Sequence, residues 1–406
     1  MHACLRHMIV AFSLAFFFSC KKDNNTPGTG QNNTGGTGTG GTQQGNYSLQ
    51  KLTLSTGERV VSPWVELAPD SVYTSLNIGS SLFRPMPTGF EDRVVSFYLP
   101  QGYMVTFASN FDGTGETATF VAVTSAIKAN LPSRLRNNIS YVRYIRFNNP
   151  EKKGTCSVSD SAVLAFGAQW HYTWGINKQS FPNQQFVPMT WGKGTCTDTD
   201  ARTLIERSDV DHLLSFNEPD HASQSNVPVD TAVQRFKIMQ KTGLRYVSPV
   251  VTQDEAFGTG KWLTEFMTKA QAQKLRVNAI AVHWYDWGNQ TNNAATDSLT
   301  AERVFSRFVT YIERVRAAYP GYPIWVTEYN ANINRSSETI HRYFMKLSTD
   351  WMNTISYIER YSYFFPPTVP GVNSNNTLTN VGAYWKSLTS PKAFTSNIVL
   401  DATIVP

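Results

Sequence analysis

Residues 213–220 read Leu-Leu-Ser-Phe-Asn-Glu-Pro-Asp, an apolar run that ends at the carboxylate of Glu218. Pro219 stops the run, because proline lacks the backbone donor that a central strand needs. Residues 324–329 read Ile-Trp-Val-Thr-Glu-Tyr and have the same form, with Glu328 near the end. We therefore predict two strands that each carry a glutamate at the carboxyl end.

The residues around these runs, from 154 to the C-terminus, alternate between apolar β-type runs and helical patterns, which favours a parallel sheet closed by βα units. Seven strands are predicted, at 163–170, 186–191, 213–217, 246–251, 279–284, 324–327 and 358–364. Helical patterns lie between them at 199–207, 230–242, 261–273, 300–319 and 338–350. The alternation predicts a (β/α)8 TIM barrel, with one further strand before Leu213 that the pattern does not show.

The two glutamates are expected to share a cleft, since the chemistry of such barrels lies at the carboxyl ends of the strands. A lone glutamate after a strand is more often a solvated loop residue, but two of them three strands apart form a stronger pattern. Two carboxylates that face one cleft are the minimum apparatus for hydrolysis of a glycosidic bond. One protonates the leaving oxygen, and the other attacks the sugar or activates water.

Several motifs of this half of the chain occur together: Trp170-His171-Tyr172-Thr173-Trp174, Phe186-Val187-Pro188-Met189, Phe216-Asn217-Glu218-Pro219-Asp220, Ala281-Val282-His283-Trp284-Tyr285, Trp325-Val326-Thr327-Glu328-Tyr329 and Glu359-Arg360-Tyr361. With them, residues 152–395 resemble glycoside hydrolase family 128 of clan A, whose members are largely retaining β-1,3-glucanases. The resemblance implies that Glu218 is the general acid/base and Glu328 the nucleophile. It also implies that Asn217 binds the sugar 2-hydroxyl.

Retaining endo-hydrolysis of β-1,3-glucan is the function that this resemblance implies. Retention predicts carboxyl groups about 5 to 5.5 Å apart, whereas about 6.5 to 9.5 Å would indicate inversion. Tyr363, Phe364 and Phe365 stand where relatives commonly carry a tryptophan, which bears on the linkage preference. Two alternatives stay open: the same chemistry on another neutral β-glycan, such as xylan, mixed-linkage glucan or an algal polysaccharide, and a non-catalytic glycan-binding lipoprotein.

Aromatic and histidine side chains near the strand ends are candidates for stacking on a sugar or for lining its site. We expect substrate contacts from Trp170, Trp174, Trp191, His283, Trp284, Tyr285 and Tyr363, although some of these rings could simply plug the barrel top. His283 and Tyr285 alternate on one strand and so share a face. By the resemblance that face looks toward Glu328, where a donated hydroxyl would keep the nucleophile ionised.

The sequence of the first 46 residues predicts a targeting signal and a linker rather than a folded domain. Residues 1–19 read as a secretory signal, and Ser19-Cys20 resembles a bacterial lipobox that would lipidate Cys20. Residues 20–46 are a linker rich in Gly, Thr and Asn. We therefore expect a lipoprotein of the bacterial cell surface or outer membrane, anchored through its lipid and facing outside or the periplasm. In that oxidising compartment Cys156 and Cys196 are a natural disulfide pair, with two buried thiols as the alternative.

Residues 47–147 carry short alternating runs that predict a small all-β domain, and residues 148–406 form the predicted barrel domain. Glu91-Asp92-Arg93-Val94-Val95-Ser96 and Arg136-Asn137-Asn138-Ile139-Ser140-Tyr141 echo each other as polar turns that enter strands. With Gly102 to Phe107 between them, they resemble the two Greek-key motifs of the β/γ-crystallin fold. Arg136 stands where calcium-binding members supply a ligand, which argues against calcium binding. The domain is expected to bind glycan or to act as a rigid spacer.

The amino-acid composition limits the classes of ligand that the protein is expected to bind. Lys and Arg number 36 against 30 Asp and Glu, an excess too small and scattered to indicate nucleic acid. The 13% aromatic content suits a flat, uncharged ligand such as a sugar. No His-Glu-x-x-His or Cys/His cluster and no glycine-rich phosphate loop occurs. We expect a monomer that binds a neutral polysaccharide and needs no metal and no cofactor.

Overall fold

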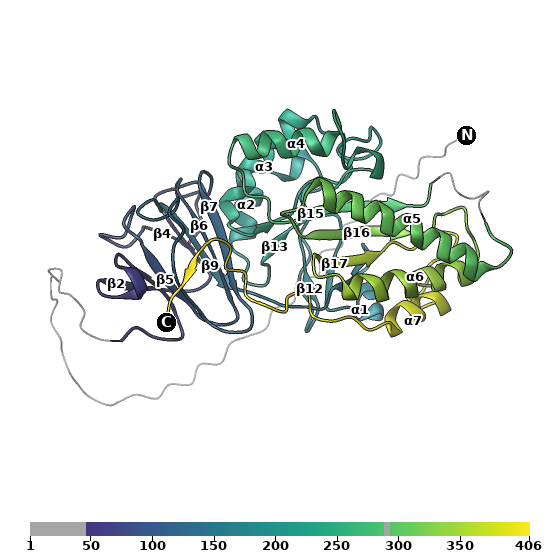
Figure 1. Ribbon diagram of the computed structural model, residues 1–406, viewed down its shortest axis with the longest axis horizontal. Coiled ribbons are helices and arrows are strands. Elements are labelled where there is room, and N and C mark those ends of the chain that lie inside the picture. Colours follow the sequence, from purple (N-terminus) through teal and green to yellow (C-terminus); the bar gives the residue numbers. More distant parts are fainter. Residues whose placement is uncertain (1–45, 288–292) are drawn as a thin grey trace, which may run out of the picture. The chain divides into compact units, whose positions relative to one another are not determined.

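The computed structural model describes residues 46–287 and 293–406 (Figure 1). The predicted signal at 1–19, the lipidation site Cys20 and all but the last residue of the linker lie outside the described residues. Within the described ranges, no helix combines the length and the apolar character that crossing a bilayer requires.

The N-terminal part is built from nine strands and one 3-10 helix, and we call it the sandwich. Its strands are β1 (Leu52–Ser55), β2 (Trp64–Leu67), β3 (Ser71–Thr74), β4 (Phe83–Arg84), β5 (Ser96–Leu99), β6 (Tyr103–Ala108), β7 (Thr117–Ala122), β8 (Ile127–Asn130) and β9 (Tyr141–Arg146), and its helix is η1 (Glu58–Val60). Together with β18 (Thr403–Ile404) from the C-terminal end of the sequence, these strands form two sheets, ordered β18-β8-β5-β1-β2 and β4-β3-β9-β6-β7. Apolar side chains from both sheets, Phe97, Phe107 and Phe120 among them, form one buried cluster.

The sandwich repeats one four-strand motif and exchanges strands between the copies. In β1-β2-β3-β5 and in β6-β7-β8-β9, the third strand leaves its own sheet: β3 pairs with β9, and β8 pairs with β5. The echoed turns hold Asp92 and Asn137 in the left-handed region, at φ 51° and 55°. The turns also meet, because Ser140 Oγ donates to Asp92 Oδ1 at 3.3 Å. The internal echo of the sequence thus corresponds to a structural repeat.

The C-terminal tail belongs to the sandwich, although the sequence placed it in the barrel domain. β18 (Thr403–Ile404) pairs with the edge strand β8, and Ile398 bridges to Val121 of β7. Asn397 Oδ1 accepts from the backbone N–H of Val123 at 2.8 Å. The predicted barrel domain of residues 148–406 was therefore too long at its C-terminal end: the sandwich is completed by the last residues of the sequence, which return from the barrel.

Eight parallel strands close the barrel. They are β10 (Lys153–Cys156), β11 (Trp170–Tyr172), β12 (Gln185–Phe186), β13 (His212–Leu213), β14 (Arg245–Tyr246), β15 (Ile280–Tyr285), β16 (Ile324–Asn330) and β17 (Ile358–Tyr363). Six of them form a continuous sheet, β13 pairs with β14, and parallel bridges Met189–Leu214 and Val247–Ala279 join the two parts. The barrel interior is filled by a cluster that includes Trp170, Tyr172 and Trp325.

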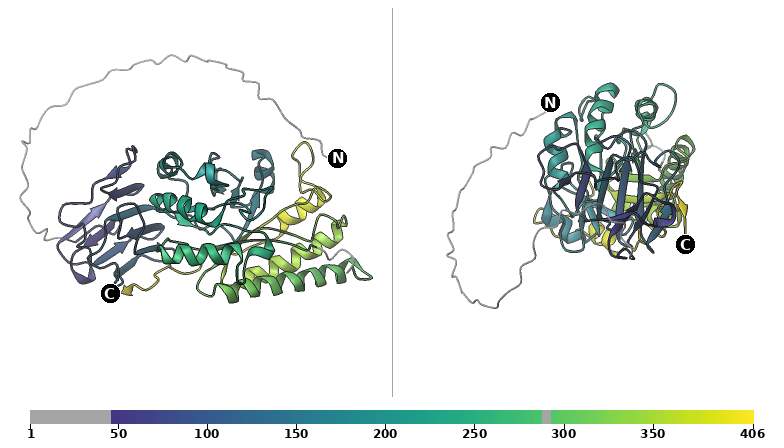
Figure 2. Two further views of the ribbon diagram at one scale, coloured as in Figure 1. Left: turned by 90° about the horizontal axis from the view of Figure 1, so that it is seen from above. Right: turned by 90° about the vertical axis from the view of Figure 1, so that its left-hand side faces the viewer.

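Seven α-helices and three 3-10 helices accompany these strands in the described residues. They are α1 (Asp160–Phe166), η2 (Lys193–Thr195), α2 (Asp198–Ile205), α3 (Val229–Met239), η3 (Gln240–Thr242), η4 (Gln253–Glu255), α4 (Trp262–Ala272), α5 (Asp297–Ala318), α6 (Glu338–Thr354) and α7 (Asn380–Ser387). The long helices α5 and α6 lie side by side against the barrel (Figures 1 and 2). The predicted (β/α)8 architecture is present, with α-helices after seven of the eight strands or their extensions.

The strand that the pattern did not show is β10, which lies between the sandwich and α1. Its residues Lys-Gly-Thr-Cys lack an apolar run, yet Lys153 and Gly154 are buried. The flanking lysines are buried as caps: Lys152 Nζ donates to the carbonyl of Ile355 at 2.8 Å, and Lys153 Nζ to that of Trp385 at 2.8 Å. Each ammonium thus satisfies carbonyls at the C-terminus of a neighbouring helix.

The predicted strand at 163–170 was wrong over most of its length. Ser159 caps the N-terminus of α1 by accepting from the Ala162 N–H, and Gly167 ends the helix at φ 65°. This Ser and Gly are ordinary start and stop signals of a short helix. The strand therefore begins only at Trp170 and continues to Tyr172.

The sandwich packs on the loops that precede barrel strands. Thr106 Oγ1 donates to the carbonyl of Gly243 at 2.8 Å, Tyr141 Oη to that of Lys241 at 2.8 Å, and Arg143 Nη2 to that of Ile205 at 2.9 Å. Gly243 has φ 63°, and a Cβ there would lie 2.3 Å from the Cβ of Arg143. These loops lie at the amino ends of β13 and β14, so the sandwich covers the end of the barrel opposite the predicted mouth.

Candidate active site

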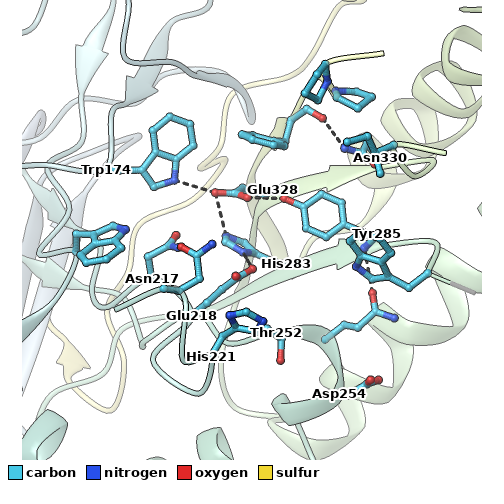
Figure 3. A pocket seen from close by; sticks show the side chains of 18 residues that line it. Trp174, Asn217, Glu218, His221, Thr252, Asp254, His283, Tyr285, Glu328 and Asn330 are labelled. Atoms are coloured by element: carbon cyan, nitrogen blue, oxygen red, sulfur yellow. Dashed lines mark hydrogen bonds and ion pairs between the residues drawn. The ribbon is translucent and has the colours of Figure 1, made fainter. Parts of the chain in front are cut away.

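Glu218 and Glu328 line one cleft of about 650 Å³ at the carboxyl ends of the barrel strands (Figure 3). Glu328 is the fifth residue of β16, and Glu218 follows the extension of β13. The backbone N–H of Glu218 donates to the carbonyl of Val250 at 2.7 Å, and its φ of 41° lies in the left-handed region. Such strain in a non-glycine residue is typical of functional positions, because the surrounding structure must hold it.

His283 lies between the two carboxylates. Its Nδ1 is 2.9 Å from Glu218 Oε1, and its Nε2 is 3.5 Å from Glu328 Oε1 (Figure 3). The imidazole is 1% exposed. The orientation of His283 toward Glu328, which the family resemblance implies, therefore describes only half of the arrangement, because the ring also binds Glu218.

The charges of this trio shift two of the pKa values. Burial would lower the pKa of His283, but the charge of Glu328 and the hydrogen bond and charge of Glu218 outweigh burial and raise it above the ordinary 6.5. Burial would raise the pKa of Glu218, but the hydrogen bond and charge of His283, with a smaller effect of His221, hold it below the ordinary 4.5. The free site thus keeps a proton on the imidazole between two carboxylates.

Glu328 is held by donors from three other side chains. Tyr285 Oη donates to Oε2, and Trp174 Nε1 donates to Oε1 at 2.8 Å. Tyr172 Oη donates to the same Oε1 at 3.2 Å and to the Thr327 carbonyl at 3.0 Å. Such a set of donors complements an ionised carboxylate and fixes its orientation, which suits a nucleophile. The expected Tyr285 contact is present.

Tyr172 is a site residue that the sequence reasoning missed. It lies inside the barrel on β11 and is buried, two positions before Trp174. Alternation along the motif from Trp170 to Trp174 would place the side chains of Trp170, Tyr172 and Trp174 on one face, so a signal existed.

Asn217 and Trp191 line the cleft beside Glu218, as does Trp174 on the Glu328 side. Asn217 Nδ2 donates to Gln224 Oε1 at 3.3 Å, whereas its Oδ1 is buried and has no hydrogen-bond partner among the described residues. A buried acceptor of this kind is available to a hydroxyl of the bound ligand. The positions fit the expected substrate contacts of these three residues.

Three predicted contact residues are core residues instead. Trp170 is fully buried at the barrel axis, where its Nε1 donates to the Lys152 carbonyl at 3.0 Å. Trp284 points away from the axis and packs on Phe308 and Phe344 of α5 and α6. Tyr363 is 1% exposed, and its Oη forms a hydrogen bond of 2.6 Å with His341 Nδ1. Trp170 lies inside the barrel but below the mouth, and Trp284 and Tyr363 point outward into the cluster that packs against the helices, so these substrate-binding assignments were wrong.

The disulfide prediction was also wrong, because Cys156 and Cys196 are both free. Cys156 lies at the end of β10 with its thiol 3.7 Å from the Tyr363 carbonyl, and Cys196 is fully buried before α2, beside Thr190 and Tyr246. Burial raises the pKa of each thiol to about 12. The cysteines are therefore free, as in the alternative interpretation, although only Cys196 is buried and Cys156 is half-buried.

Further residues line the cleft without having been predicted as substrate contacts. They come from the end of β16 and from the loops after β13, β14, β15, β16 and β17: His221, Gln224, Thr252, Gln253, Asp254, Trp287, Asn330, Ile333, Phe364, Pro366 and Pro367. Loop positions carry no strand period, so pattern reading could not place them. In the described ranges, no group of three or more His, Cys, Asp or Glu side chains is arranged to hold a metal ion.

Residues 136–390 match a family model described as glycosyl hydrolase catalytic core. This span is more than half of the chain and contains both glutamates and the whole cleft lining. No curated protein matches the chain.

Three solved structures illustrate the structural similarity. A family 128 subgroup I endo-β-1,3-glucanase from Amycolatopsis mediterranei, in complex with laminarihexaose, is 29% identical and covers 59% of this chain and 100% of its own, with a TM-score of 0.49. A subgroup III curdlan-specific exo-β-1,3-glucanase from Blastomyces gilchristii is 26% identical and covers 58% and 98%, with a TM-score of 0.46. A subgroup II endo-β-1,3-glucanase from Sorangium cellulosum is 20% identical and covers 59% and 99%, with a TM-score of 0.48.

Proposed function

Because the chain belongs to the family of glycosyl hydrolase catalytic cores and is a glycoside hydrolase, we propose that it cleaves β-1,3-glucan internally, with retention of configuration, through Glu328 and Glu218. The observation that carries this proposal is the trio in which His283 contacts both carboxylates in one cleft. The β-1,3-glucan specificity follows the resemblance of the motifs around these residues to family 128.

In the first step, Glu328 attacks the anomeric carbon while the glycosidic oxygen leaves. The three donors from Tyr285, Trp174 and Tyr172 hold the carboxylate in a fixed orientation, so little reorganisation is needed before attack. The bond from carbon to the Glu328 oxygen forms as the bond to the leaving oxygen breaks. The leaving oxygen takes a proton from Glu218, and a covalent glycosyl-enzyme results.

In the second step, water enters in place of the leaving sugar. Glu218, now ionised, takes a proton from the water, and the water oxygen displaces Glu328 from the anomeric carbon. Two inversions give overall retention. Asn217, beside Glu218, is placed to bind the 2-hydroxyl, a contact that strengthens as the ring flattens in the transition state.

The proton that Glu218 donates is shared with His283. A carboxyl with a lowered pKa by itself seldom carries the proton that it must donate, but the neighbouring imidazole has a raised pKa and holds a proton 2.9 Å away. The two groups titrate as a coupled pair that carries one proton in the reactive form.

This coupling predicts the alkaline limb of the pH profile. The pair loses its proton as pH rises through the raised pKa of His283, so kcat/KM should fall only above about pH 6.5. In His283→Gln the proton must rest on Glu218 alone, whose ordinary pKa is 4.5, so the limb should move to lower pH. The measurement is kcat/KM against pH for both proteins, with thermal unfolding to verify the fold. An unshifted limb would contradict the shared proton.

The substrate assignment is tested with a panel of polysaccharides. Laminarin and curdlan should release reducing sugar, whereas xylan should not, and product sizing should show oligosaccharides of several lengths, as endo-cleavage requires. Proton NMR taken in the first minutes should show the β-anomer of the new reducing end. Release from xylan or mixed-linkage glucan instead would reassign the substrate, and binding without release on every glucan would support the non-catalytic alternative.

For the sandwich we propose a β/γ-crystallin-like fold that acts as a spacer. The exchange of third strands between its two four-strand motifs supports this fold, and so do the paired left-handed turns at Asp92 and Asn137. Its position at the amino ends of the barrel strands supports the spacer role, because this places it away from the cleft.

A further inference from the structure

A second pocket, of about 380 Å³, adjoins the catalytic cleft, and we call it the side pocket. Gln253, Asp254 and Tyr285 line both, so the side pocket and the cleft share a wall. The wall includes the tyrosine that binds Glu328. A ligand in the cleft could therefore extend into the side pocket without leaving the protein surface.

One face of α5 forms the floor of the side pocket. Arg307, Thr310, Tyr311 and Arg314 all line it, at positions i, i+3, i+4 and i+7 of the helix. This spacing puts their side chains in one row. The helix thus presents a polar row toward the loops at the barrel mouth, in addition to the apolar side that packs on the barrel.

Tyr311 supplies a buried hydroxyl that nothing in the described structure satisfies. The residue is 8% exposed, and its Oη has no hydrogen-bond partner among the described residues. Buried polar groups are nearly always paired, so an orphaned hydroxyl at a pocket wall indicates a partner that is supplied from outside. The ring of Tyr311 lies 5.7 Å from that of Phe257, which fixes its position.

Arg314 and Asp254 add a donor and an acceptor of opposite charge. The Arg314 guanidinium lies 4.5 Å above the Phe257 ring, and neither Arg314 nor Asp254 forms an ion pair within the described ranges. Arg307, by contrast, is committed to Asp286 through contacts of 2.8 and 2.6 Å. A guanidinium, a carboxylate, a phenol and an amide around one apolar ring match the adjacent hydroxyls and flat face of a neutral sugar.

We propose that the side pocket is a subsite for a glucosyl unit of the same glucan, away from the bond that is cleaved. This inference rests on the proposed function. The unit could belong to the main chain beyond the cleft or to a side branch, and the chemistry that binds it is the same. The charges at the pocket largely offset one another, because Lys261 pairs with Glu255, Arg307 pairs with Asp286, and Arg314 and Asp254 carry opposite charges, which suits an uncharged ligand.

Two variants remove the key groups with little change to packing. Tyr311→Phe deletes the orphaned hydroxyl and keeps the ring, and Arg314→Ala deletes an exposed guanidinium. Arg303→Ala is the matched control, because Arg303 is an exposed arginine on the same helix that does not line the pocket. Each protein is assayed on linear β-1,3-gluco-oligosaccharides of three to eight units and on β-1,6-branched ones with the same main-chain length.

Both pocket variants should raise KM about three- to tenfold on the substrates that reach the side pocket, with kcat and the trisaccharide unaffected. An effect confined to the longer linear substrates assigns the subsite to the main chain, and an effect confined to the branched ones assigns it to a branch. An equal effect on all substrates, or none, with a fully active wild type overturns the subsite alone. A wild type that is inactive on every β-1,3-glucan overturns the proposed function and this inference with it.

Discussion

Glu328→Gln should lower kcat on laminarin by roughly 10⁴-fold or more, because the amide cannot form the glycosyl-enzyme. The amide is nearly the same size. With its oxygen in the place of Oε1 it still accepts from the indole N–H of Trp174, and its NH2 group in the place of Oε2 donates to the hydroxyl of Tyr285, so the protein should keep its fold and its affinity for the glucan. The checks are initial rates of reducing-sugar release, glucan binding by calorimetry and the midpoint of thermal unfolding. Glu265→Gln, an exposed glutamate on α4, is the matched control and should retain full activity.

A smaller side chain at the same position tests the role itself. In Glu328→Gly, azide can occupy the space of the carboxylate and attack an activated β-glucosyl fluoride, which would give the α-glycosyl azide. That product requires one inversion where the wild type makes two. If azide restored activity without being incorporated, or if the β-azide formed, Glu328 would not be the nucleophile.

The second large effect is expected for Glu218→Ala, which removes the acid that protonates the leaving oxygen. On laminarin kcat should fall about 10²- to 10⁴-fold, the usual contribution of general acid–base catalysis. On an aryl β-glycoside whose phenolate leaves without a proton, the first step should be nearly unaffected, and the glycosyl-enzyme should accumulate. A burst of phenolate followed by a slow steady state would show this.

Azide distinguishes the two glutamates here too. In Glu218→Ala it should attack the accumulated glycosyl-enzyme from the face where Glu218 stood and give the β-glycosyl azide. An equal loss of rate on the glucan and on the aryl glycoside would show that Glu218 positions the substrate rather than moves a proton. The two variants should give opposite anomers of the glycosyl azide. If the roles of Glu218 and Glu328 were exchanged, the two anomers would be exchanged as well.

The parts of the fold that could be predicted from the sequence are those with a strong local period. The runs that end at Glu218 and Glu328 contain β-type residues bounded by clear stops, and both glutamates line the cleft as expected. β10 could not be predicted, because its burial depends on Lys152 and Lys153, whose side chains cap helices that are distant in the sequence. A local sequence pattern does not reveal such contacts.

The site was harder to predict than the fold, because the sequence pattern shows neither which face of a strand points into the barrel nor how far below the mouth a side chain lies. Trp170 and Trp284 belong to the same motifs as Trp174 and Tyr285, yet the former pack in the core and the latter contact Glu328. The simultaneous contacts of His283 with Glu218 and Glu328 could not be predicted either. It depends on the left-handed backbone of Glu218, which turns that carboxylate back toward β15.

The position of the sandwich has a practical consequence for how the enzyme can be held. The first described residue, Asn46, leads into the sandwich, and the last residues return to it, so both ends of the described chain lie on that domain. The hydrogen bonds of Thr106 and Arg143 connect the sandwich to the segments before β14 and β13, so a force applied to either end of the described chain reaches the amino ends of the barrel strands. Immobilisation on a bead through either terminus would therefore load the closed end and leave the entrance to the cleft free for a large, insoluble polymer.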